Sequence, residues 1–248
     1  MVRPAPPAGR RLPLGLSDLL IMLIVGFGGA RFLLPLLAAV LGIRVQPGGV
    51  NVPAVMFLLG VQTLLLVAVI YVVAVRWRGV RPDELGFVAP PPGWLARAVL
   101  VALVSFPLVG AVSWLQQQIT GEPFRNPQFD VLAPPGFAWP AYLATLVVAA
   151  VLAPVVEEVA FRGILYRWLA ERAPGPLAAA GSALVFAFLH GVPSLVPGIF
   201  LLGVILAWVY AHTRSIWAPI VVHGTYNAVV TTALYAALAQ GVRPPGLG

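Results

Sequence analysis

The sequence predicts an all-α protein, a polytopic bundle of about seven transmembrane helices around a polar cavity inside the bilayer. Hydrophobic residues make up 60% of the 248 residues and charged residues only 9%. Soluble globular domains, by comparison, have about 45–50% apolar and about 25% charged residues. The apolar residues also form blocks of about 20 residues or more, the length that crosses a bilayer. Lipid is therefore the expected surroundings of nearly the whole chain.

Short breaks rich in proline and glycine, such as residues 46–49, 90–93 and 134–136, separate the apolar blocks. The first block runs to about Leu41, longer than the roughly 7–15 residues of a signal-peptide core, so a retained transmembrane helix is expected. The chain is predicted to divide into N-terminal transmembrane helices with a surface segment and a catalytic helical core, over residues 1–135 and 136–240. The predicted helices cover residues 17–42, 52–76, 94–118, 139–172, 175–191, 196–212 and 216–239.

Basic side chains indicate the orientation of the bundle. The net charge is +7 and every basic residue is arginine. The arginines lie mainly at the ends of apolar blocks, which favours control of membrane topology over nucleic-acid binding. The compact, lysine-free chain is typical of a prokaryotic inner membrane protein. A cytoplasmic N-terminus and an outer C-terminus place ten arginines inside and three outside: Arg3, Arg10, Arg11, Arg76, Arg78, Arg81, Arg97, Arg167, Arg172 and Arg214, against Arg44, Arg125 and Arg243.

Several ionisable residues fall within the predicted membrane helices. Such a group costs at least about 2.5–3.5 kcal/mol in the bilayer core, so its presence requires a reason. The chain has no cysteine, which excludes thiol catalysis and cysteine-bound metals. Six ionisable residues lie in or near the predicted helices: Arg31, Glu157, Glu158, Arg162, His190 and His223. All but Arg31 lie in the C-terminal half, where the amide of Asn227 joins them, and they indicate one polar site there.

Helical spacing assigns partners to the carboxylates. Glu158 and Arg162 are four residues apart, so they share a helix face and are expected to form a buried ion pair. Glu157 is rotated by about 100° from Glu158 and has no cation on its own face. A carboxylate of this kind suits a general base. A salt bridge from Glu157 to Arg31 is the alternative interpretation.

The same spacing groups the remaining polar residues. His190 follows Phe186 by four residues, and Asn227 follows His223 by four. An imidazole and an amide on one helix face supply hydrogen-bond donors of the kind that stabilise an oxyanion. A glutamate and a histidine on facing helices can hold a water and accept its proton. Each histidine alone would more often be a satisfied interior residue, and their coincidence with Glu157 favours a catalytic site.

Other intramembrane hydrolytic mechanisms lack their residues. A Ser–Lys dyad is impossible without lysine, and no His-Glu-x-x-His motif is present. A pair of catalytic aspartates is not expected, because the aspartates lie at helix ends or in loops, at Asp18, Asp83 and Asp130. Glutamate and histidine chemistry is what remains.

These motifs resemble the CPBP (CAAX protease and bacteriocin-processing) family, also called Abi. Its EExxxR, FxxxH and HxxxN motifs match residues 157–162, 186–190 and 223–227 in order and spacing. Residues 81–87, Arg-Pro-Asp-Glu-Leu-Gly-Phe, resemble an element that precedes the family's core. Each motif is short, but three in order on successive apolar helices are a strong signal.

The resemblance implies an intramembrane endopeptidase similar to CAAX prenyl proteases, acting on a peptide or protein substrate that enters from the membrane. It implies that Glu157 and His190 activate water and that His223 and Asn227 stabilise the oxyanion. It also implies that three residues support the structure of the site: Glu158, Arg162 and Phe186. No cofactor is the preferred expectation. A zinc ion held by Glu157, His190 and His223 is the alternative, because catalytic zinc takes three protein ligands. A non-catalytic membrane scaffold or bacteriocin-immunity protein of the same fold is the alternative function.

Overall fold

The computed structural model describes residues 11–43, 51–122 and 126–242, which contain helices and no strand. The first half comprises α1 (Leu16–Ile21), η1 (Met22–Gly28), α2 (Gly29–Val40), α3 (Val52–Ile70), η2 (Tyr71–Trp77), η3 (Pro82–Leu85), α4 (Trp94–Thr120) and α5 (Pro127–Leu132). The second half comprises α6 (Trp139–Thr145), η4 (Leu146–Leu152), α7 (Ala153–Glu158), η5 (Val159–Tyr166), α8 (Arg167–Ala170), α9 (Gly175–Leu189), η6 (Pro193–Leu195), α10 (Val196–Thr213) and α11 (Trp217–Ala239).

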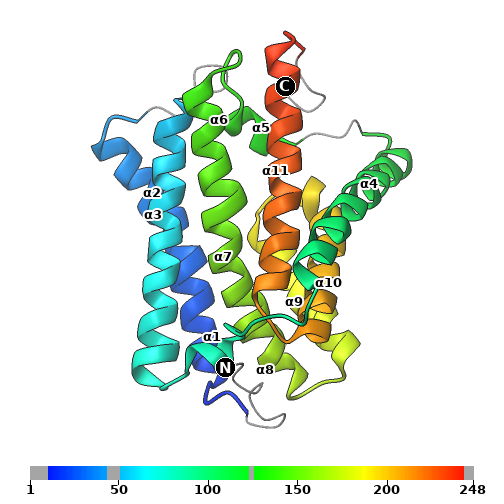
Figure 1. The fold of residues 1–248 in the computed structure, drawn as a ribbon. Coiled ribbons are helices and arrows are strands. Elements are labelled where there is room, and N and C mark those ends of the chain that lie inside the picture. The colour runs from blue at the N-terminus through cyan, green and yellow to red at the C-terminus, as the bar shows by residue number, and fades with distance from the viewer. Residues whose placement is uncertain (1–10, 44–50, 123–125, 243–248) are drawn as a thin grey trace.

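Several of these elements run on into one another, and together they form the seven long helices that the sequence predicts. The continuous helix at residues 139–170, from α6 to α8, lies in the middle of the bundle between α3 and α11 (Figure 1). The α9–α10 pair packs against η5, and α4 packs against α10 and α11. The described N-terminal residues, α8 and the α10–α11 turn lie at one end of the bundle, and α11 ends at the other (Figure 1).

The outer surface of the bundle is apolar. Five of the described helical stretches are long and apolar enough to cross a membrane, and α9 is a shorter apolar helix. Large hydrophobic side chains point outward, including Phe32, which is 84% exposed, and Ile119, which is 76% exposed. Exposing so much apolar surface is unfavourable in water and favourable against lipid tails. The protein is therefore an integral membrane protein that crosses the bilayer several times.

The segment before α4 is tied to the residues that precede α11. The carboxylate of Glu84 accepts a hydrogen bond from the backbone N–H of Arg81, which closes the η3 turn. The carbonyl of Gly86 accepts a hydrogen bond of 2.8 Å from the N–H of Ile216, and Ser215 Oγ donates to Val88 at 2.6 Å. Since Ser215 and Ile216 lie just before α11, this segment holds the start of that helix in place.

Helix α11 approaches the central helix closely at Gly224. A Cβ atom placed on Gly224 would lie 2.5 Å from the carbonyl oxygen of Ala150. A contact this short with backbone forces the two helices apart, and such overpacking costs about 1–3 kcal/mol. We expect Gly224→Ala to lower the unfolding free energy by about that amount, measured by denaturant titration in detergent. Gly110→Ala is the matched control, because a Cβ at Gly110 has no neighbour within 4 Å.

Candidate active site

The central helix changes its winding on both sides of the glutamates. The six residues of α7 lie between two π-helical stretches, η4 and η5. Pro154 begins this turn and has no N–H for the carbonyls four and five residues before it, those of Ala150 and Ala149. Such carbonyls need another donor inside a membrane. Asn227 Nδ2 donates to the Ala149 carbonyl at 2.8 Å. The amide of α11 thus supplies a hydrogen bond that the proline cannot.

Glu158 and Arg162 form the ion pair that their spacing predicts. Arg162 Nη1 donates to Glu158 Oε1 at 2.9 Å, and both side chains are fully buried. Arg162 Nη2 donates to the carbonyl of Gly203 at 3.0 Å, which ties η5 to α10. A fully buried pair of this kind requires further hydrogen bonds to offset its loss of hydration. The Gly203 carbonyl provides one of them.

His223 lies between the two glutamates. Its Nδ1 is 2.9 Å from Glu158 Oε1, and its Nε2 is 3.8 Å from Glu157 Oε2. Glu158 also accepts from Arg162, so it acts as a carboxylate acceptor and His223 Nδ1 is the donor. The neutral imidazole then presents its Nε2 lone pair toward Glu157. This arrangement, in which a carboxylate orients an imidazole, also occurs in catalytic triads.

Phe186 packs between the charged residues and both histidines. Its ring lies edge-to-face with the rings of His190 and His223, at centroid distances of 4.7 and 5.7 Å. The guanidinium of Arg162 lies 4.6 Å from the same ring centroid, a cation–π contact. Substituting Phe186 would therefore loosen three site residues at once.

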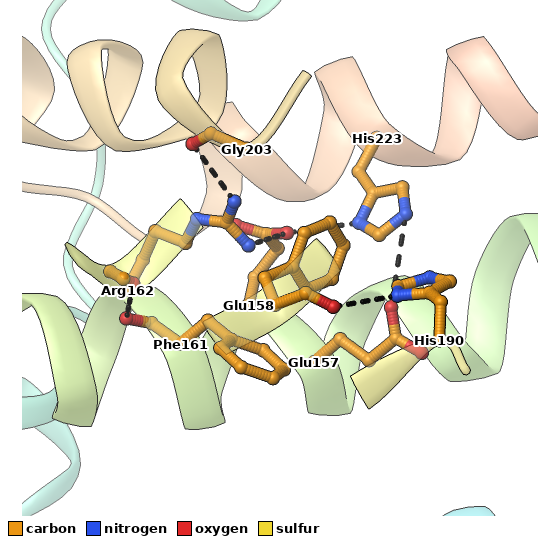
Figure 2. Close-up of polar contacts among 9 residues, drawn as sticks. Glu157, Glu158, Phe161, Arg162, His190, Gly203 and His223 are labelled. Carbon is orange, nitrogen blue, oxygen red and sulfur yellow. Dashed lines mark hydrogen bonds and ion pairs between the residues drawn. The ribbon is translucent and has the colours of Figure 1, made fainter. Parts of the chain in front are cut away.

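His190 ends α9 and is oriented by backbone. Its Nδ1 is 2.8 Å from the carbonyl of Phe186, which can only accept, so Nδ1 carries the proton. Its Nε2 is then the free nitrogen. Glu157 and His190 are both drawn in Figure 2, where the Glu157 carboxylate is joined to His223 by a dashed line. Among the described residues no hydrogen bond or ion pair joins Glu157 to His190, whereas His223 Nε2 lies 3.8 Å from Glu157 Oε2.

The segment that carries this site matches a known family. Residues 138–229 match the family model described as Type II CAAX prenyl endopeptidase Rce1-like. The chain is 27% identical over 139 residues to the protein named "Putative membrane peptidase YdiL" of Bacillus subtilis (strain 168). Both matches support the resemblance of this segment to the CPBP family. The aligned part covers 55% of this chain and 54% of that relative, about half the length of each. No solved structure matches the chain.

The motifs that resemble those of the CPBP family come together in the structure, on α7, η5, the end of α9 and α11. Their residues are Glu157, Glu158, Arg162, Phe186, His190, His223 and Asn227. Glu157 is 21% exposed at its side chain and Glu158 is fully buried, so Glu157 is the more accessible glutamate of the pair. The alternative partner of Glu157, Arg31, has a side chain outside the described part of the structure. Asn227 has one amide hydrogen engaged by Ala149 and a second left for another acceptor.

Sequence reasoning missed the bond between Glu158 and His223. It treated Glu158 as a structural partner of Arg162, which it is, but the same oxygen also holds the imidazole. These residues are 65 positions apart on different helices. Helical periodicity relates residues within one helix, so no signal in a single sequence predicts this contact.

The three-ligand zinc alternative stays a prediction. Zinc requires three protein ligands converging on one point. Within residues 11–43, 51–122 and 126–242, no three His, Asp or Glu side chains are grouped as a metal site. The Nδ1 atoms of His190 and His223 are both engaged, by Phe186 and by Glu158, so Nε2 is the nitrogen through which either ring would bind a metal.

Proposed function

We propose that this protein is an intramembrane endopeptidase that hydrolyses peptide bonds with a water activated by Glu157 and histidine. The observation that carries the proposal is the 3.8 Å separation of Glu157 Oε2 and His223 Nε2. Both atoms are hydrogen-bond acceptors, and their separation is too long for a direct hydrogen bond. One water that donates a hydrogen to each atom spans such a distance at ordinary hydrogen-bond lengths.

The proposed reaction uses these groups in turn. The water oxygen attacks the scissile carbonyl carbon while Glu157 accepts a water proton as general base. Glu157 passes this proton to an imidazole, and the oxyanion is stabilised by the resulting imidazolium and by the second amide hydrogen of Asn227. The imidazolium then delivers the proton to the leaving nitrogen, the C–N bond breaks, and a carboxylic acid and an amine are released, which ionise to a carboxylate and an ammonium group. Glu158 is a positioning residue here, because it acts through the orientation of His223.

The motif resemblance pairs Glu157 with His190, while the distances favour His223 as the second acceptor of the water. The proposal retains both imidazoles, since each presents a free Nε2 at the same site. We expect His190→Ala and His223→Ala each to lose most of the activity. The substrate class is a peptide at or within the membrane of a prokaryotic cell, with the N-terminus of the protein in the cytoplasm. The arginines at the N-terminal end of the bundle support this orientation.

Hydrolysis itself is the test. The purified protein in liposomes is given a mixture of membrane-associated peptides in water enriched in ¹⁸O. Mass spectrometry should find cleaved peptides with one ¹⁸O atom in each new carboxylate. The products should be absent from empty liposomes and strongly reduced with the two histidine variants. Equal cleavage by the wild type and both variants would refute the proposal.

Metal removal provides a separate prediction. Because no three-ligand metal set is present among the described residues, we propose that the reaction needs no metal. Dialysis against a strong chelator should leave the rate within about twofold, since loss of a catalytic zinc would remove its activated water. A zinc-dependent peptidase treated in parallel should become inactive. Loss of activity on chelation, with recovery when zinc is added back, would contradict this prediction.

A further inference from the structure

A polar cavity lies away from the proposed active site, at the arginine-rich end of the bundle. It has a volume of about 460 Å³ and lies where three predicted spans meet the membrane surface. Arg11 precedes the first span, Arg167 is near the end of the central helix, and Arg214 follows α10. The residues of the lining that the argument uses are Arg11, Arg167, Arg214, Glu171, Tyr166 and Tyr210.

The lining is strongly basic. Three guanidinium groups border the cavity against one carboxylate, that of Glu171. Both oxygens of Glu171 are engaged, one by the N–H of Leu12 at 2.8 Å and one by Arg172 Nη1 at 3.2 Å. Arg167 also donates a hydrogen bond to the carbonyl of Glu84. The cavity therefore has an excess of positive charge.

The conformation of Arg214 is a second, independent observation. Its φ of 53° makes it the one residue other than glycine with a positive φ in the described part of the chain. Glycine or asparagine adopts this left-handed conformation at lower cost than arginine does. Its N–H donates to the carbonyl of Tyr210 at 2.8 Å and so ends α10. The backbone at this position favours glycine or asparagine, yet the chain has an arginine there. This cost indicates that the guanidinium of Arg214 has a binding role.

Two tyrosines form the inner part of the cavity. The rings of Tyr166 and Tyr210 meet edge-to-face with a centroid distance of 5.8 Å. Both residues are buried, Tyr210 to 3% exposure, and both line the cavity. Tyrosine hydroxyls donate hydrogen bonds, and planar guanidinium groups bind phosphate oxygens in pairs. The lining thus combines cations and neutral donors of the kind that bind a phosphate group.

We propose that this cavity binds a phosphate-bearing anion at the membrane surface. Basic pockets between membrane helices on the cytoplasmic side bind the phosphates of acidic lipid headgroups. A free phosphate from the aqueous side has the same chemistry. The site is separate from the Glu157 site and does not depend on the peptidase proposal.

Binding is measured with the full-length protein in a neutral detergent. The probes are a fluorescent short-chain phosphatidylglycerol, its zwitterionic phosphatidylcholine analogue, and inorganic phosphate as competitor. Arg214→Asn removes the charge and keeps a residue that tolerates φ of 53°. We expect it to weaken phosphatidylglycerol binding at least about tenfold, the loss of one charged hydrogen bond. Arg11→Gln is a second variant that leaves α10 untouched.

Arg76→Gln is the matched control, because Arg76 is an exposed arginine at the same end of the bundle but outside the cavity lining. It should change the affinity less than about twofold. Saturable binding of phosphatidylglycerol that inorganic phosphate does not displace assigns the site to a lipid headgroup. Displacement by inorganic phosphate assigns it to a free phosphate, and either result supports the proposal. Absence of saturable binding, or equal losses in Arg76→Gln and both cavity variants, overturns it.

Discussion

Replacing Glu157 with glutamine is expected to lower kcat/KM for peptide cleavage by roughly 10²–10⁴-fold, the usual contribution of a general base. The amide has nearly the same shape as the carboxylate but cannot accept the water's proton. Because the side chain of Glu157 is 21% exposed and its Oε2 is 3.8 Å from His223 Nε2, too far for a direct hydrogen bond, the substitution should leave the folded state intact. The measurement is initial cleavage rate against substrate concentration in liposomes, with the melting temperature recorded for each protein.

Glu122→Gln serves as the matched control for this prediction. Glu122 is exposed, follows α4 and lies outside the site, so the same chemical change there should leave kcat/KM within about twofold, as surface substitutions usually do. A Glu157→Gln protein that cleaves peptides as fast as the Glu122→Gln protein would show that Glu157 is not the base. The proposed mechanism would then lose its proton acceptor, whatever the histidine variants do.

Local patterns in the sequence were sufficient for the helices and for one contact of the site. The apolar blocks predicted seven helices, and the structure places helices over all of them. The ion pair of Glu158 with Arg162 followed from a four-residue spacing, which holds because successive helical turns place such residues side by side. The division of the chain at residue 135 and the catalytic roles stay predictions.

Contacts between helices could not be predicted in the same way. The four-residue spacing of His223 and Asn227 placed both on one face of α11, and both do contact the central helix. Their individual partners depend on the register between the two helices. That register is set by the close approach of Gly224 to Ala150, a tertiary contact that no periodicity encodes.

The π-helical stretches of the central helix are a second example. The apolar pattern of residues 139–172 predicts an α-helix of 3.6 residues per turn throughout. In the structure η4 and η5 are π-helical, with more residues in each turn. Pro154 lies at the boundary of η4 and α7 and removes a hydrogen bond there. Proline in a sequence indicates such an interruption but does not tell how the chain accommodates it. Here the side chain of Asn227 on another helix supplies the missing donor.

Arg162→Met is expected to have the largest effect on stability, about 3–5 kcal/mol, because it leaves the charge of Glu158 buried without its cation. Both side chains are fully buried, so water cannot replace the guanidinium. The substitution also removes the donor to the Gly203 carbonyl, which lies on α10. The measurement is the unfolding free energy in a mixed-micelle denaturant titration, with tryptophan fluorescence as the signal.

The double variant Glu158→Gln with Arg162→Met distinguishes two causes of instability. One is the unpaired charge of Glu158, and the other is the loss of the contacts made by the Arg162 side chain. A neutral glutamine still offers an oxygen to His223 Nδ1 but no longer requires a cation, so the double variant should be more stable than Arg162→Met alone. Recovery of about half of the lost free energy is expected, since buried pairs are costly mainly when one partner is removed. If the double variant were less stable than the single one, the uncompensated charge would not be the cause. Arg162 would then stabilise the protein chiefly by linking η5 to α10 and by its contact with Phe186.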